Sequence, residues 1–146
     1  MAEINPVTAE LAAQINDLAN QGLALLGLTA ATPPEDVVAA ITQRVRDCKA
    51  AGTVLPEEQS FALGALLGNQ YVLGHDWHWG GVVWDFDEEN GAVGVLNHDD
   101  SLFMNPIGWV AETLESEGSV GFMLNYNLVA ANEVPVRDPG SATGLY

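Results

Sequence analysis

Three histidines and four aspartates occupy one part of the chain. They are His75, His78, His98, Asp76, Asp85, Asp99 and Asp100. Imidazole and carboxylate groups are ligands for zinc and other transition metals. His75 and His78 are three residues apart at the entrance of a predicted strand, so they tend to point to opposite faces. Turn capping and ordinary strand positions explain these residues more simply, and we expect no bound metal or other cofactor.

The usual catalytic motifs are absent from the sequence. There is no Gly-x-Ser-x-Gly elbow, no Gly-x-x-x-x-Gly-Lys loop, no His-Glu-x-x-His and no Cys-x-x-Cys. The one cysteine, Cys48, falls on the apolar stripe of a predicted helix, as a buried structural thiol would. We therefore assign no catalytic residue and expect a protein that is not an enzyme. The alternative is a small enzyme or metal protein that uses His75, His78 or His98 with a nearby aspartate.

The charge of the chain is strongly one-sided. Twenty Asp and Glu stand against four Lys and Arg, which gives a formal net charge of -16. From Ala50 to Val136 there are thirteen acidic residues and no Lys or Arg. Such a field repels nucleic acids and anionic membranes, and it attracts basic proteins, metal ions or salt counter-ions. We therefore expect a basic protein partner and no nucleic acid or membrane partner.

Aromatic residues stand beside these acids. Strand alternation would place Trp77 and Trp79 on the same face as Asp85, and Trp84 and Phe86 on the opposite face. We expect Trp84 and Trp109 in the core. If the face of Trp77 and Trp79 is open, it combines aromatic anchors with an acidic rim, as binding hot spots do. If the N-terminal helices cover it, the tryptophans are ordinary core residues. The candidate partner-binding residues are Trp77, Trp79, Asp85, Asp87, Glu88, Glu89, Asp99 and Asp100.

The elements that would position these residues begin with three helices. Apolar periodicity and end signals predict helices from Thr8 to about Leu26, from residues 32–34 to 51, and from residues 56–58 to about Leu73. Gly64 and Gly68 leave one side of the third helix without bulk, so another backbone can approach it closely. The basic cluster of residues 44–49 lies in the last turns of the second helix, where cations suit the exposed carbonyl groups.

A strand meander and further helices follow. Residues 77–86 predict a strand covered on both faces, with a bulge at Gly80–Gly81. Residues 87–91 end in Asn-Gly and predict a hairpin turn, although their oxygens partly resemble a calcium loop. Residues 92–96 and 101–104 predict two more strands. Asn105 and Pro106 begin a fourth helix, and residues 119–130 suit a fifth helix or, alternatively, a strand.

These elements predict an α+β fold. N-terminal helices (about 8–74) precede a three-stranded antiparallel meander (about 75–104), and one or two C-terminal helices (about 105–130) pack on the sheet. We expect one domain over residues 1–131 and an irregular tail over residues 132–146.

The central run carries a resemblance. It comprises Leu63-Gly64-Ala65-Leu66-Leu67-Gly68-Asn69-Gln70, Trp77-His78-Trp79, Val93 to Asn105-Pro106, and Trp109-Val110. This run resembles a family of small uncharacterised bacterial α+β domains in which a Gly-containing helix precedes a Trp hairpin and a Trp-Val helix. The resemblance covers residues 57–130 and implies no catalytic residues. Small acidic domains of this sort are similar in type to immunity proteins, which neutralise bacterial toxins.

Two functional hypotheses follow besides the enzyme or metal alternative. The first is a non-catalytic immunity or antitoxin-like protein that neutralises a basic toxin domain through its acidic surface. The second is a salt-adapted protein of unrelated function, whose solvated acids and single lysine suit a saline habitat. The N-terminus has no basic and apolar signal pattern, and the longest apolar run is too short to span a bilayer. A cytoplasmic location is therefore expected.

Overall fold

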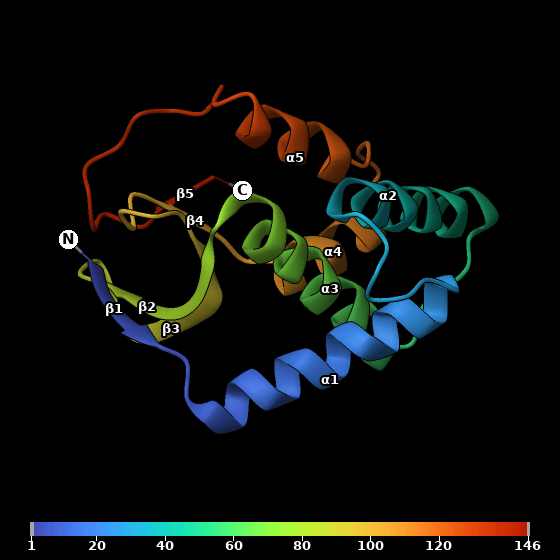
Figure 1. The fold of residues 1–146 in the computed structure, drawn as a ribbon, viewed down its shortest axis with the longest axis horizontal. Coiled ribbons are helices and arrows are strands. Elements are labelled where there is room, and N and C mark those ends of the chain that lie inside the picture. Colours follow the sequence, from blue (N-terminus) through green and yellow to red (C-terminus); the bar gives the residue numbers. More distant parts are fainter. Residues whose placement is uncertain (1, 146) are drawn as a thin grey trace.

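The computed structural model describes residues 2–145 and places a sheet at one end and a stack of helices at the other (Figure 1). The elements are β1 (Ala2–Pro6), α1 (Ala9–Leu26), α2 (Pro34–Ala51), α3 (Glu57–His75), β2 (His78–Trp84), β3 (Asp87–Leu96), β4 (Leu102–Met104), α4 (Pro106–Glu115), α5 (Phe122–Ala130) and β5 (Thr143–Gly144). The α+β class is confirmed.

Local signals at helix ends set most of the helix boundaries. The Thr8 hydroxyl accepts a hydrogen bond from the Leu11 amide at 3.1 Å and caps α1. The Asn105 side chain accepts from the Gly108 amide at 2.9 Å and caps α4, with Pro106 in the first turn. At the other end of α2, Gly52 takes a left-handed conformation with φ of 67°. These three predicted ends are confirmed.

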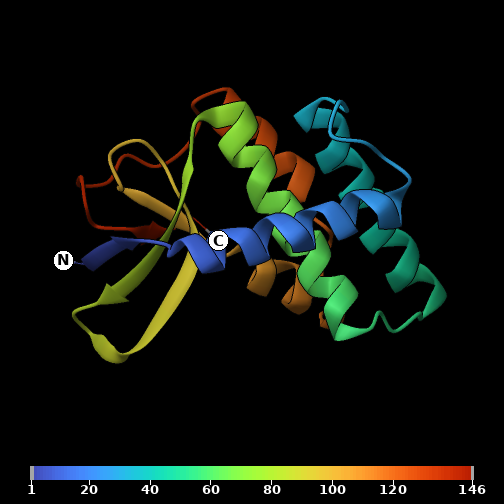
Figure 2. The same cartoon turned by 60° about the horizontal axis from the view of Figure 1, so that its bottom comes forward.

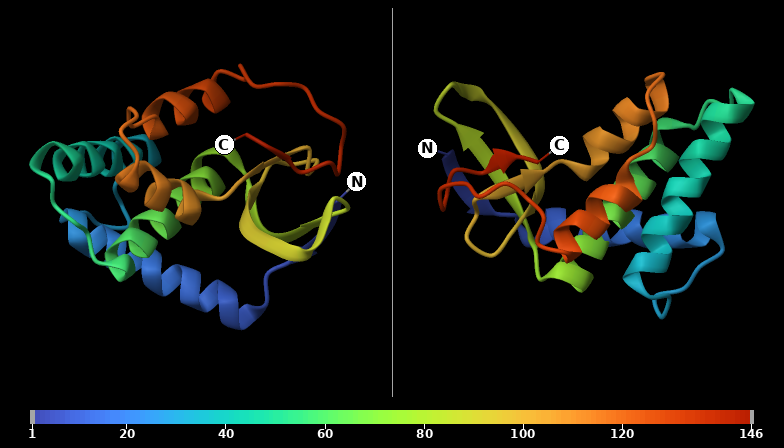
Figure 3. Two further views of the ribbon diagram at one scale, coloured as in Figure 1. Left: turned by 180° about the vertical axis from the view of Figure 1, so that it is seen from behind. Right: turned by 90° about the horizontal axis from the view of Figure 1, so that it is seen from above.

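Helix α3 lies at the centre of the helical stack. Figures 2 and 3 show α1 crossing one side of it and α4 running along another, and α3 also contacts α2, α5, β2 and β3. A methyl group added to Gly64 would overlap the Ile107 backbone, and one added to Gly68 would overlap Trp79. The predicted close approach is confirmed. The helix continues past the predicted end at Leu73, and Asp76 ends it with φ of 59°.

The sheet has five strands in the order β1-β2-β3-β4-β5, so the prediction of a three-stranded meander was incomplete. The β1–β2, β2–β3 and β3–β4 pairs are antiparallel, and β4–β5 is parallel. The tail predicted to be irregular supplies β5. Both additional strands are short and sit at the sheet edges, so their hydrogen bonds come from strands that are distant in sequence and leave no local pattern.

The β2–β3 hairpin differs from its prediction in two places. The register breaks between Val83 and Trp84, where Val83 pairs with Gly91 but Trp84 pairs with Asp87. The bulge is therefore at the tip of the hairpin and not at Gly80–Gly81. The chain turns at residues 85–86, and residues 88–90 bow out of the ladder within β3. The predicted Asn-Gly turn was consequently wrong.

Different parts of the chain pack on the two faces of the sheet. Trp79, Val93 and Val95 face the helices and join the main core. Val82, Leu96 and Phe103 form a second cluster with Ala142. Ala142 belongs to residues 138–145, here called the C-terminal strap, which returns from α5 to the sheet (Figure 3). Backbone hydrogen bonds fix the strap: the Ala142 amide donates to the Asp100 carbonyl and the Leu145 amide to the Phe103 carbonyl, both at 2.8 Å.

Candidate functional site

Trp84 and Phe86 form an aromatic pair at the tip of the β2–β3 hairpin. Their rings are nearly parallel, with an angle of 21° and centroids 6.0 Å apart. The Trp84 ring also meets Phe103 edge to face at 5.3 Å, and its Nε1 donates to the Ala142 carbonyl at 3.1 Å. Trp84 is therefore held by the sheet and the C-terminal strap. Phe86 is 85% exposed, which is unusual for a side chain of this size.

Three surface hollows adjoin Trp84. One of about 620 Å³ is lined by Asp85, Phe86 and Asp138, and one of about 570 Å³ by Phe86, Asp87 and the strap. A third of about 420 Å³ is lined by Glu3 and Glu88, again with Asp85. No Lys or Arg within residues 2–145 lines any of the three. We call the following set the Trp84 surface: Glu3, Trp84, Asp85, Phe86, Asp87, Glu88 and Asp138.

The basic residues are engaged elsewhere or lie outside these hollows. The Lys49 ammonium donates to the carbonyl oxygens of Thr113, at 2.7 Å, and of Ser116. It thus satisfies carbonyl groups at the C-terminal end of α4 rather than those of its own helix. Arg137 donates to the neighbouring Val136 carbonyl. Lys49 and Arg137 thus both donate to backbone carbonyl oxygens.

Trp77 and Trp79 do not belong to an open surface. Trp77 is 5% exposed and packs in the main core. Trp79 lies over Gly68 of α3, and its Nε1 donates to the Asn69 side chain at 2.9 Å. The glycines of α3 let the helix come close enough to cover this face. The alternative of a covered face therefore holds, with Trp77 buried and Trp79 half-buried. Trp109 is buried as expected, whereas Trp84, also expected in the core, is only half-buried.

The structure separates the other candidate residues into two groups. Asp85, Asp87 and Glu88 lie together on the Trp84 surface, and exposed Glu89 is next to them in β3 but does not line these three hollows. Asp99 and Asp100 are in the β3–β4 turn instead. Their carbonyl oxygens accept hydrogen bonds from the strap amides of Gly140, at 2.9 Å, and Ala142. This turn therefore supports the strap and does not line the hollows.

Sequence reasoning missed four residues of the surface, namely Glu3, Trp84, Phe86 and Asp138. Trp84 and Phe86 were placed together on one strand face, but that face was taken as covered. The sequence did contain a signal for the exposure of Trp84 and Phe86. Both stand directly beside a run of acidic residues at a turn, and a turn rich in acids usually lies at the surface. Glu3 and Asp138 reach the surface through β1 and the strap, and no local signal indicates either pairing.

The three histidines are dispersed. His75 packs against Tyr126, with ring centroids 4.2 Å apart, and burial lowers its pKa below the usual value. His78 Nε2 lies 2.8 Å from an Asp100 carboxylate oxygen. His98 is exposed in the turn. Within residues 2–145, no three His, Cys, Asp or Glu side chains gather in a way that could hold a metal ion.

Two further details bear on chemistry. The Ser101 hydroxyl is the main cause that lowers the pKa of Asp99, an arrangement that orders the β3–β4 turn. Cys48 is buried, as its place on the helix stripe predicted. Within residues 2–145, no histidine is hydrogen-bonded to a Ser, Thr or Cys side chain. Exposed aromatic rings among carboxylates, by contrast, are suited to bind cationic groups.

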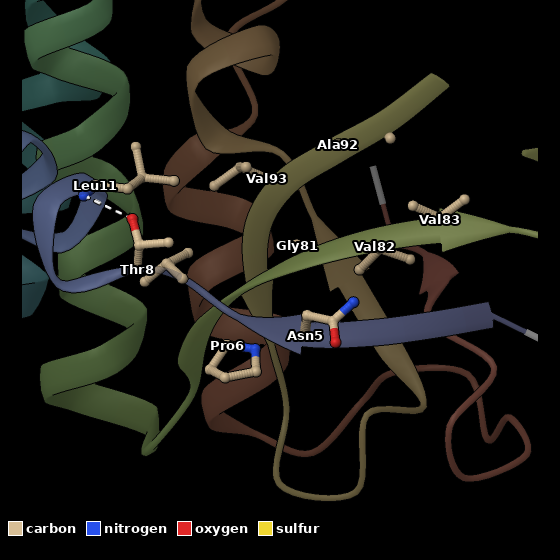
Figure 4. Close-up of a pocket in the computed structure, with 11 residues that line it drawn as sticks. Asn5, Pro6, Thr8, Leu11, Gly81, Val82, Val83, Ala92 and Val93 are labelled. Atoms are coloured by element: carbon tan, nitrogen blue, oxygen red, sulfur yellow. Dashed lines mark hydrogen bonds between the residues drawn. The ribbon is translucent and has the colours of Figure 1, made fainter. Parts of the chain in front are cut away.

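A fourth hollow lies on the other side of the hairpin. It has a volume of about 310 Å³ and lies between the β1–α1 connection and the β2–β3 pair. Figure 4 shows Val83, Val93 and Leu11 around it, with Asn5 and Thr8 as its polar residues. Thr8 is occupied as the cap of α1. The hollow is mainly apolar and has no charged lining residue. It therefore offers fewer groups that could select a ligand than the Trp84 surface does.

Comparison with protein-family models, curated proteins and solved structures finds no match. The resemblance to a bacterial domain family therefore stays a prediction. No helix within residues 2–145 combines the length and the apolar character needed to cross a membrane.

Proposed function

We propose that this is a non-catalytic binding protein of the immunity or antitoxin type, which holds a basic bacterial protein on its Trp84 surface. The observation that carries the proposal is the lining of the hollows. Five carboxylates, those of Glu3, Asp85, Asp87, Glu88 and Asp138, line the hollows beside the rings of Trp84 and Phe86, of which Trp84 is held in place. Aromatic anchors with a charged rim are the composition of interface hot spots.

Charge supports the same conclusion at longer range. The net charge of -16 gives a field that steers a basic partner toward the protein and speeds association. The hairpin carries a dense part of that charge, because Asp85, Asp87, Glu88 and Glu89 are nearly consecutive. The partner of a toxin-neutralising protein would meet this surface with its own basic active-site or nucleic-acid-binding face.

The test compares two variants with equal changes of charge. Glu3→Gln/Asp87→Asn/Glu88→Gln neutralises the Trp84 surface. Glu57→Gln/Glu115→Gln/Glu117→Gln is the control, since Glu57 and Glu115 line a hollow between α3 and α4 at the helical end. Each is used to capture proteins from the native host, followed by identification and rebinding of the purified partner.

We expect the wild type and the control to capture one basic protein and the Trp84-surface variant to lose it. Co-expression of the wild type should also relieve the toxicity of that partner. Capture of no basic protein, or equal capture by both variants, would overturn the proposal. If the captured basic protein is not toxic, the binding function would still stand, but the assignment to the immunity or antitoxin type would be wrong.

A further inference from the structure

We propose that the hollows beside Trp84 bind arginine side chains of the partner, with each guanidinium stacked on an aromatic ring and hydrogen-bonded to a neighbouring carboxylate. This inference rests on the proposed function and names the chemical group that the surface selects. It distinguishes arginine from lysine, which net charge alone does not.

The first argument is that each hollow combines an aromatic surface with carboxylates. Trp84 lines all three hollows, and Phe86 lines two of them. Asp138 and Asp87 each share a hollow with both rings, while Glu3 and Glu88 share the third with Trp84. A cation that enters any of the three therefore meets a ring and an acidic group together.

The second argument is the shape of the cation that this combination fits. A guanidinium is planar, stacks on aromatic rings and offers five donors that match carboxylate oxygens. A lysine ammonium has no plane to stack and is more strongly hydrated. A metal ion needs several ligands converging on one point, and no group of three potential ligands does so within residues 2–145. Carboxylates spread around two rings suit a larger, flat cation.

The third argument is rigidity. Trp84 is fixed by the hydrogen bond to Ala142 and by the edge contact with Phe103. The strap beneath it is held by amides bonded to the β3–β4 turn and to β4. A ring that is already held in place loses little conformational entropy when a guanidinium stacks on it. Phe86 is 85% exposed and stacks on Trp84, so it adds a second aromatic ring that a cation can reach from solvent.

The experiment uses two synthetic probes of equal charge, nona-arginine and nona-lysine, with the full-length protein in 150 mM salt. Calorimetry and tryptophan fluorescence measure binding. We expect the arginine peptide to bind about three- to tenfold more tightly, the scale of one or two exposed cation–π contacts. The variant Phe86→Ser removes one ring at a position that is 85% exposed, so its fold is retained, and it should lower the preference for arginine.

Two further variants complete the design. Asp87→Asn/Asp138→Asn should weaken binding of the arginine peptide, and Glu57→Gln/Glu115→Gln should not. Equal affinity for both peptides, no binding of either, or an arginine preference unchanged in Phe86→Ser would each overturn the inference. None of these results decides the proposed function, which depends on capture of the partner. Conversely, an arginine preference without any captured partner would support this inference and overturn the function.

Discussion

The indole nitrogen of Trp84 donates a hydrogen bond to the carbonyl oxygen of Ala142, 3.1 Å away, and so ties the hairpin to the C-terminal strap. The strap otherwise holds through β5, which has two residues, and through the amides of Gly140 and Ala142, which donate to the β3–β4 turn. One wall of the Trp84 surface is therefore fixed in part by a contact between residues 58 positions apart in the sequence.

Replacement of Trp84 by Phe should loosen the strap. The change keeps an aromatic ring against Phe103 but leaves the Ala142 carbonyl without its donor, at a cost of about 1 kcal/mol. Hydrogen exchange of the Ala142, Thr143 and Leu145 amides should accelerate relative to the amides of β2. Phe86→Leu is the matched control because Phe86 is exposed. Equal exchange in wild type and Trp84→Phe would show that the hydrogen bond does not hold the strap.

Gly64→Ala should destabilise the whole fold. A methyl group at this position would overlap the Ile107 backbone, so α3 and α4 would have to separate, at a cost of about 1–3 kcal/mol. Urea unfolding measures the loss. Gly81→Ala is the control, since the nearest atom to its added methyl carbon, the Asn5 carbonyl oxygen, is 3.9 Å away. Similar midpoints for the two variants would contradict the close approach of α3 and α4.

Lys49→Met should destabilise the end of α4. The ammonium donates to the carbonyl oxygens of Thr113 and Ser116, and loss of charged hydrogen bonds costs about 1.5–3 kcal/mol when the partners stay buried. Because this site is partly exposed, we expect the free energy of unfolding, measured with urea, to fall by about 1 kcal/mol. Arg46→Met, on the same helix and exposed, should change the stability little. A larger effect from Arg46 would mean that the basic cluster has another role.

How far the sequence predicts this fold depends on the range of the signal. Thr8, Gly52 and Asn105 act on amides or carbonyls a few residues away, so their roles were predictable. β1 and β5 depend on pairing with β2 and β4, and nothing within five residues specifies such pairing. Hairpin geometry was missed for a related reason: Asn90-Gly91 is a strong turn signal, but pairing of Gly91 with Val83 keeps it within β3.

The candidate site shows the same division. Alternation placed Trp77 and Trp79 on one face and Trp84 and Phe86 on the other. Which face is covered is a tertiary property, decided by the approach of α3 through Gly68. The acids of the hairpin were predicted as a binding region because their density is visible in the sequence. The aromatic partners of these acids, Trp84 and Phe86, were missed because their face of the strand was expected to be covered.

The stability of the protein should fall as the pH is lowered through the titration of His75. Burial lowers the pKa of His75 in the folded state below the ordinary value of 6.5. The unfolded chain therefore binds the proton first, and His75 opposes folding increasingly as pH falls below that value. Tyr71 and Tyr126, which pack against the imidazole, stay neutral because their pKa values are raised.

The measurement is urea unfolding of wild type and His75→Phe between pH 7.5 and 5. Phenylalanine keeps a ring against Tyr126 but does not titrate, so the stability difference should shift in favour of the variant as the pH falls. NMR titration of the imidazole supplies a direct readout of the folded pKa. A difference that is constant over this range would contradict the burial of a neutral His75.

Salt dependence distinguishes a partner-binding protein from a salt-adapted one. No Asp, Glu, Lys or Arg is among the buried side chains of residues 2–145, so the core forms without charge pairing. We therefore expect the native fold at 20 mM potassium chloride, with a melting temperature that rises by a few degrees toward 1 M as repulsion between acids is screened. Circular dichroism at both concentrations measures this. Asp87→Asn/Glu88→Gln/Glu89→Gln should show a smaller rise, because it removes adjacent like charges. Loss of the fold at 20 mM would instead mean that the acidity serves a saline habitat, since the repulsion would then exceed what the neutral core can offset.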